Sequence, residues 1–114
     1  MSEVSSMPRC RVADTPLKRM RGLLGLDGLP VGEGLLIRPC KAIHTYGMRF
    51  ALDVRFYDRQ GRLVRAMSGV RPGRWWIWGG WRAHSALECA AGDSSFQDCH
   101  SLDHVEFLPA TRQK

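Results

Sequence analysis

The strongest structural signal in the chain is a strict alternation of side chains over residues 52–57. Leu52, Val54 and Phe56 alternate with Asp53, Arg55 and Tyr57. Successive side chains of a β-strand point to opposite faces, so this pattern predicts a strand with one buried face. Residues 58–61 (Asp-Arg-Gln-Gly) are typical of a turn, and residues 62–67 are predicted to return as the antiparallel partner.

Further short strands are predicted along the chain, separated by glycine and proline. They cover residues 35–37, 74–78, 84–90 and 104–108. Strands at this spacing indicate a small β domain. We therefore expect a mainly β fold, bordering on α+β: a small antiparallel barrel or sandwich with one short helix near the N-terminus. A length of 114 residues predicts a single domain, 1–114, with loose tails at 1–11 and 109–114.

The expected helix begins at residues 14–16 (Asp-Thr-Pro), where a polar side chain can cap the first turn and proline is tolerated. Leu17, Met20 and Leu24 then recur at the spacing of one helical face. The glycines that follow limit this helix to about two turns.

The sequence carries no sign of export or of a membrane span. No apolar run approaches the roughly 20 residues that a membrane helix needs, and residues 1–6 lack the pattern of a secretory signal. We expect a cytoplasmic protein. The cysteines at 10, 40, 89 and 99 include no closely spaced pair, which predicts free thiols.

A metal site is the alternative use of these cysteines. Cys40 with His44, or Cys99 with His100, together with His84 or His104, would supply ligands that zinc prefers. The segment after Cys40 does not look helical, however, and adjacent Cys-His residues seldom chelate one ion. We therefore expect no metal and no cofactor.

Positive charge and tryptophan are concentrated in one stretch. The net charge is +6, and residues 59–82 contain six arginines and no acid. Such a field attracts phosphates, nucleic acid or acidic proteins, unless it serves only solubility. Alternation over residues 75–78 forces indoles onto both faces, so some should be exposed. The predicted contact surface for an anionic ligand, a protein partner or a second copy consists of Arg71, Arg74, Trp75, Trp76, Trp78, Trp81 and Arg82.

An ordered set of motifs resembles a known family. The motifs are residues 19–24 (Arg-Met-Arg-Gly-Leu-Leu), 34–37 (Gly-Leu-Leu-Ile), 44–56 (His-Thr-Tyr-Gly-Met-Arg-Phe-Ala-Leu-Asp-Val-Arg-Phe) with Asp58 and Gly61, and 87–92 (Leu-Glu-Cys-Ala-Ala-Gly). Together they resemble the bacterial and archaeal family called domain of unknown function 192, over about residues 12–108. The resemblance implies a compact, β-rich fold and no particular activity. Many members of that family look exported, whereas this chain shows no leader.

A polar cluster in the same motifs is the candidate ligand site: His44, Thr45, Arg49, Asp53 and Glu88. His44 titrates near neutrality and could act as an acid or base. Asp53 could orient it or pair with Arg49. The alternative is structural, with Asp53 and Glu88 binding backbone N–H groups at strand ends. No spacing here is diagnostic of a catalytic triad.

These observations favour a non-catalytic binding or accessory module with a basic, tryptophan-rich contact surface. Two alternatives stay open. One is a small enzyme that uses the His44–Asp53–Glu88 pocket, although a base, a nucleophile and an oxyanion donor are only loosely indicated. The other is binding of nucleic acid or another polyanion, although no established nucleic-acid motif is present.

Overall fold

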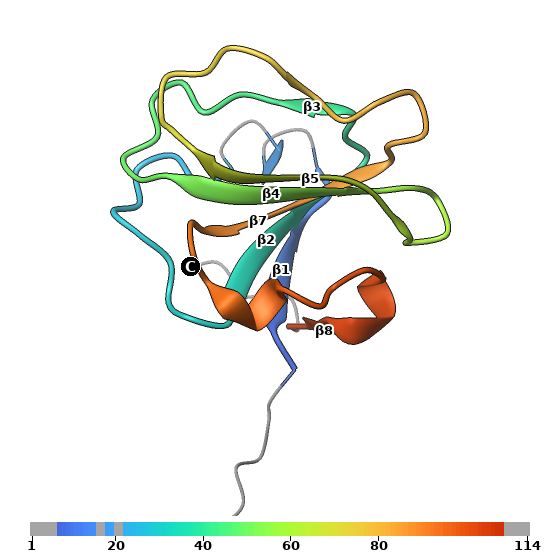
Figure 1. The fold of residues 1–114 in the computed structure, drawn as a ribbon. Helices are drawn as coiled ribbons and strands as arrows, with labels where there is room; N and C mark the ends of the chain where they lie inside the picture. Colours follow the sequence, from blue (N-terminus) through green and yellow to red (C-terminus); the bar gives the residue numbers. More distant parts are fainter. Residues whose placement is uncertain (1–6, 16–17, 20–21, 109–114) are drawn as a thin grey trace, which may run out of the picture.

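The chain folds into two β-sheets, which Figure 1 shows for the computed structural model. The structure describes residues 7–15, 18–19 and 22–108. The main sheet has the strand order β5-β4-β7-β2-β1-β8, and β3 pairs with β6 in the small sheet. The bounds are β1 (Arg9–Ala13), β2 (Glu33–Ile37), β3 (Ala42–Ile43), β4 (Leu52–Tyr57), β5 (Leu63–Val70), β6 (Ile77–Trp78), β7 (Ser85–Ala90) and β8 (Glu106–Phe107), with 3-10 turns η1 (Ser94–Phe96) and η2 (Leu102–His104).

The hairpin predicted from the alternating segment is confirmed. β4 and β5 are antiparallel neighbours in the main sheet. The carboxylate of Asp58 accepts hydrogen bonds of 2.9 Å from the backbone N–H groups of Gln60 and Arg62. Gly61 has a φ of +78°, which favours glycine at this position of the turn.

The mainly β fold that we expected is confirmed, but the barrel form of that prediction, offered beside a sandwich, is wrong in two respects. The main sheet is open, with β5 and β8 as its edges among the described residues. It is also mixed, because β1 runs parallel to both β2 and β8. Residues 9–11, which we expected in a loose tail, belong to β1, and Cys10 is fully buried there. The remaining expected tail residues, 1–6 and 109–114, lie outside the described residues.

The expected N-terminal helix is not supported. Part of it, residues 16–17 and 20–21, lies outside the described residues. Around that gap, Arg19 N–H donates to the carbonyl of Thr15 and Gly22 N–H to that of Lys18, both at 2.9 Å. Gly22 then adopts a φ of +48°, which directs the chain into turns. Among the described residues, these two hydrogen bonds do not extend into a helix of about two turns.

The main sheet buries side chains on both faces. One core lies between this sheet and the β3–β6 pair, which Figure 1 shows on the side of β4 and β5. It contains Leu23, Ile43, Met48, Leu52, Val54, Phe56, Val70, Ile77, Ala83 and Ala86. The other core lies around η1 and contains Cys10, Leu36, Tyr57, Leu87, Cys89, Phe96, Cys99 and Val105. Tyr57 closes this second core, because its hydroxyl donates a hydrogen bond of 2.7 Å to the carbonyl of Cys99.

The chain after β6 lies directly on the first core. A Cβ atom at Gly79 would overlap the aromatic ring of Phe56, so only glycine fits this close approach. This contact holds the segment that carries Trp76 and Trp78 against the main sheet. Only Ile77–Trp78 of the expected strand 74–78 is paired, because residues 71–76 form an exposed loop.

Candidate functional site

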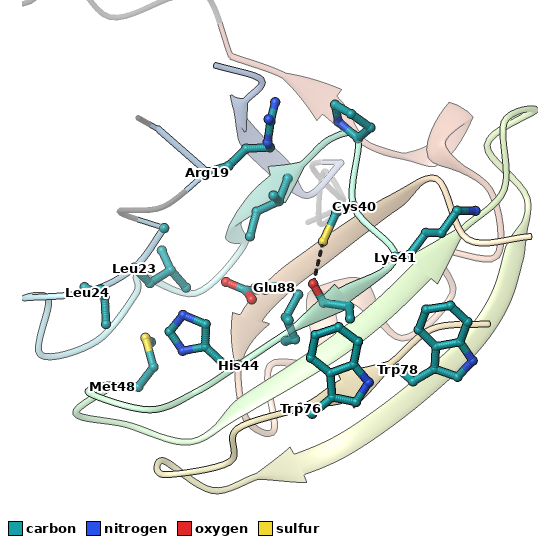
Figure 2. A pocket seen from close by; sticks show the side chains of 15 residues that line it. Arg19, Leu23, Leu24, Cys40, Lys41, His44, Met48, Trp76, Trp78 and Glu88 are labelled. Carbon is teal, nitrogen blue, oxygen red and sulfur yellow. Dashed lines mark hydrogen bonds between the residues drawn. The ribbon is translucent and has the colours of Figure 1, made fainter. Parts of the chain in front are cut away.

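A cavity of about 390 Å³ opens beside the first core (Figure 2). This volume lies in the lower part of the range for small-molecule sites. Its walls come from the N-terminal turn, the end of β2, the link through β3, the β6 segment and β7. The lining residues are Arg19, Gly22, Leu23, Leu24, Ile37, Pro39, Cys40, Lys41, Ala42, Ile43, His44, Met48, Trp76, Trp78 and Glu88.

The cavity gathers motifs that are far apart in the sequence. Residues 19–24, 34–37, 44–56 and 87–92, which carry the family resemblance, each contribute lining side chains. The tertiary fold therefore brings the four motifs to one place.

Glu88 contributes a buried carboxyl group to this cavity. It lies in the middle of β7, opposite Leu35 of β2 and Val54 of β4. Its side chain points into the cavity (Figure 2), and only 4% of the residue is exposed. Within the described part of the chain, its carboxylate has no hydrogen-bond or ion-pair partner. Burial raises the pKa of Glu88 to about 8, because the charged form loses its water.

The cationic side chains of the cavity do not compensate Glu88. Lys41 donates from its ammonium to the carbonyls of Trp81 and Ala83, at 2.9 Å for the latter, and points away from the cavity in Figure 2. The guanidinium of Arg19 donates to the carbonyl of Asp14 at 3.3 Å. The carboxylate therefore faces the cavity without an opposite charge from either residue.

Two further polar groups line the cavity. His44 lies beside Met48, on the same side as the Glu88 carboxylate in Figure 2. The thiol of Cys40 donates a hydrogen bond of 3.1 Å to the carbonyl of Ala42. Burial raises the pKa of this thiol to about 11, which keeps it protonated at neutral pH.

The side of the cavity formed by β6 is aromatic. The indoles of Trp76 and Trp78 lie nearly parallel, at 10°, with their ring centroids 6.4 Å apart. Figure 2 shows both rings face-on and next to each other, and we call them the tryptophan platform. Trp76 is 67% exposed, whereas Trp78 is half-buried and has the edge of Trp81 packed against it. Arg65 donates to the carbonyl of Trp78 at 2.9 Å and holds this strand in place.

Of the predicted polar cluster, His44 and Glu88 are brought together at the cavity, and the other three residues are not. Thr45 is fully buried, and its hydroxyl binds backbone atoms of residues 71 and 74. Arg49 forms an exposed ion pair of 3.0 Å with Asp27. Asp53 accepts hydrogen bonds from the N–H groups of Gly69 (2.8 Å) and Gly92 (3.0 Å), which agrees with the structural alternative.

The predicted contact surface is exposed over most of its residues. Trp75, Trp76 and Trp81 are exposed, as are the arginines at 71, 74 and 82. Trp75 stacks on the ring of Tyr46, with centroids 4.2 Å apart. The expectation that some indoles must face solvent is therefore confirmed. Trp76 and Trp78 belong to this surface and also line the cavity, whereas Trp75 and Tyr46 do not line it.

All four cysteine thiols are free. Among the described residues, no three His, Cys, Asp or Glu side chains are grouped closely enough to hold a metal ion. Cys40, His44 and Glu88 line the same cavity, but they are not grouped closely enough to hold a metal ion.

Sequence reasoning missed the apolar walls of the cavity, such as Leu23, Ile43 and Met48. Leu23 and Met48 lie in segments rich in turns and Ile43 lies in the two-residue strand β3, so their burial depends on the packing of distant segments. The one usable signal was the placement of Leu23 and Met48 inside the family motifs.

One family model covers nearly the whole chain. The model of domain of unknown function 192, described as "Uncharacterized ACR", matches residues 2–107. No curated protein matches the chain. Among the described residues, no helix is both long and apolar enough to cross a membrane.

Two solved structures share the fold at 18% sequence identity. A protein of unknown function from Novosphingobium aromaticivorans DSM 12444 superimposes with a TM-score of 0.68, over 75% of this chain and 65% of its own, just under two thirds of that protein. A proposed transcription regulator from Sinorhizobium meliloti 1021 has a TM-score of 0.71, over 81% of this chain and 75% of its own. At this identity, the likeness concerns the fold alone.

Proposed function

The chain belongs to the family of domain of unknown function 192, and we propose that it is a non-catalytic binding module for a small organic ligand. The observation that best supports this proposal is the buried carboxyl group of Glu88. It points into the cavity and has no partner among the described residues. A buried polar group without a partner is costly, and a ligand that donates hydrogen bonds to it would remove that cost.

The chemistry of the cavity supports binding over catalysis. Cys40 is a protonated thiol hydrogen-bonded to a backbone carbonyl, which makes it a poor nucleophile. Thr45 is fully buried and bound to the backbone, so its hydroxyl does not reach a ligand. His44 and Glu88 alone would supply an acid and a base without a nucleophile. The proposal also includes that the chain forms a single domain and that the protein is cytoplasmic.

The exposed surface outside the cavity supports a second candidate function, contact with a polyanion or an acidic partner. The stacked rings of Tyr46 and Trp75 adjoin the exposed Arg71 and Arg74, with no acid among residues 71–82. Aromatic rings beside arginine suit single-stranded nucleic acid. Binding of a fluorescent oligothymidine that weakens steeply as salt rises would support this candidate. A dimer on this surface would instead appear as a concentration-dependent mass that resists salt.

The pocket proposal is tested by NMR titration of ¹⁵N-labelled protein with three probes. Benzamidine presents paired N–H donors, methyl β-D-glucopyranoside presents O–H donors, and benzoate presents only acceptors. We expect at least one donor probe to shift the amide signals of Leu23, Ile43 and Glu88 at about pH 9, where the charged carboxylate of Glu88 only accepts hydrogen bonds, and benzoate to leave them unchanged.

Two variants complete this experiment. Glu88→Leu should abolish the shifts because it removes the acceptor. The matched control Glu106→Leu, at an exposed position of β8, should retain them. The proposal fails if neither donor probe shifts the cavity signals, or if Glu88→Leu binds the probes as wild type does.

A further inference from the structure

The tryptophan platform and Glu88 share one cavity, although they come from opposite sides of the first core. Trp76 and Trp78 are two positions apart in the chain, so a locally extended backbone places both indoles on the same side. Their rings differ by only 10° in orientation. The cavity therefore combines a broad aromatic surface on the β6 side with the buried carboxyl group of Glu88 on the main-sheet strand β7.

From this combination we infer that the cavity binds a neutral pyranose sugar. One C–H face of the ring stacks on the tryptophan platform, and neighbouring hydroxyls form hydrogen bonds with the carboxyl group of Glu88. This inference rests on the proposed function and specifies its ligand class.

Aromatic stacking and a carboxyl group together fit a sugar for a physical reason. The faces of a pyranose carry mostly C–H groups, which pack on an indole, and its rim carries adjacent hydroxyls. A carboxyl group has two oxygens and can engage two such hydroxyls at once. A purely apolar ligand would leave the carboxyl of Glu88 buried and unpaired, which costs free energy.

Charge argues for a neutral ligand. The chain carries a net charge of +6, so a cationic ligand would meet repulsion on approach. An anionic ligand would meet no compensating charge from Arg19 or Lys41, because both bind backbone carbonyls. Burial raises the pKa of Glu88 to about 8, so at neutral pH its carboxyl is mostly protonated and can both donate to and accept from a hydroxyl.

The test is a titration with methyl β-D-glucopyranoside, followed by tryptophan fluorescence and by NMR. We expect a blue shift of the emission, since a stacked sugar removes water from the indole of Trp76, and shifts of the Glu88 and Ile43 amide signals. Cellotetraose, titrated in parallel, separates a free sugar from a glycan chain. Tighter binding of the tetrasaccharide indicates a glycan, equal binding indicates a single sugar ring, and both support the pyranose assignment.

Two pairs of variants make the inference falsifiable. Trp76→Ala should weaken sugar binding about fivefold or more, as expected for one lost stacking contact. The control Trp75→Ala removes an indole that stacks on Tyr46 and does not line the cavity, and it should bind as wild type does. Glu88→Leu should weaken binding about tenfold or more, whereas Glu88→Gln keeps a donor and an acceptor and should lose less than about fivefold.

The outcomes separate this inference from the proposed function. If benzamidine shifts the cavity signals but neither sugar does, the sugar inference is overturned and the binding module stands. Equal loss of sugar binding in Glu88→Gln and Glu88→Leu would show that a charged carboxylate is needed, which contradicts the protonated carboxyl that we assign to Glu88. If no donor probe binds, both proposals fail.

Discussion

The hydroxyl of Thr45 accepts a hydrogen bond of 2.9 Å from the backbone N–H of Arg74, and it donates one of 2.7 Å to the carbonyl of Arg71. The backbone of Thr45 adds a further hydrogen bond of 2.7 Å, donated to the carbonyl of Arg74. One buried threonine thus holds both ends of the exposed loop that precedes Trp75 and Trp76. This makes Thr45 a positioning residue for the aromatic segment.

Replacement of Thr45 by valine should therefore destabilise the protein. Valine has the same shape but leaves the N–H of Arg74 and the carbonyl of Arg71 without their partner, which costs about 1–3 kcal/mol. Thr45→Ser retains the hydroxyl and should lose less. Urea unfolding of the two variants measures the difference. Equal stability of Thr45→Val and wild type would contradict the role that we assign to this hydroxyl.

Glu88→Leu should stabilise the protein while it removes ligand binding. The substitution replaces a buried carboxyl that has no described partner by an apolar side chain of similar size. We expect a gain of about 1–3 kcal/mol in the free energy of unfolding at neutral pH. The measurement is chemical denaturation beside the exposed control Glu106→Leu, which should change little. A clear loss of stability in Glu88→Leu would mean that the carboxyl makes a favourable contact in the folded chain.

The stability of the protein should depend on pH through the titration of Glu88. Folding raises the pKa of Glu88 from 4.5 to about 8, so the folded state binds the proton more tightly than the unfolded state does. Stability then falls as pH rises from about 5 to about 8, and becomes level above that range. We expect wild type to lose at least about 1 kcal/mol relative to Glu88→Gln over this interval. Parallel stability curves for the two proteins would contradict this prediction.

Asp53 should contribute by joining β5 to the turn that follows β7. Its two carboxylate oxygens accept hydrogen bonds from the N–H groups of Gly69, in β5, and Gly92, in that turn. Asp53→Ala should lower the free energy of unfolding by about 1–2 kcal/mol. This is the low end of the range for loss of hydrogen bonds to a charged group, because Asp53 is only half-buried. Asp53→Asn keeps one acceptor and should lose less. An unchanged melting temperature in Asp53→Ala would contradict the structural role that we assign to Asp53.

The sequence predicted those parts of the fold that depend on neighbouring residues. Alternation located β4, and the turn chemistry of residues 58–61 located the hairpin. The parallel placement of β1 between β2 and β8 was not predictable, because it depends on pairing with a segment almost a whole chain length away. The N-terminal helix was expected from the start signal at residues 14–16 and from apolar spacing, and the glycine at position 22 redirects the chain.

The sequence predicted some residues of the candidate site but not which of them share one face of the sheet. His44 and Glu88 were recognised as polar residues in motifs of the family and do line one cavity. Asp53 was placed with them but faces the other side of the sheet, because its neighbour Val54 is the residue that pairs with Glu88. Alternation predicts which residues of a strand share a face. It does not predict the register between strands, and that register decides which faces meet.

The position of Glu88 in the strand order also determines when during folding the cavity can appear. β7 pairs on one side with β2, formed by residues 33–37, and on the other with β4, formed by residues 52–57. Both partners must dock before the carboxyl group loses its water. Pairing between such distant segments is a slow step in folding, since long loops must close first. The early, local hairpin β4–β5 contains none of the cavity residues, so a folding intermediate limited to that hairpin would have no binding site.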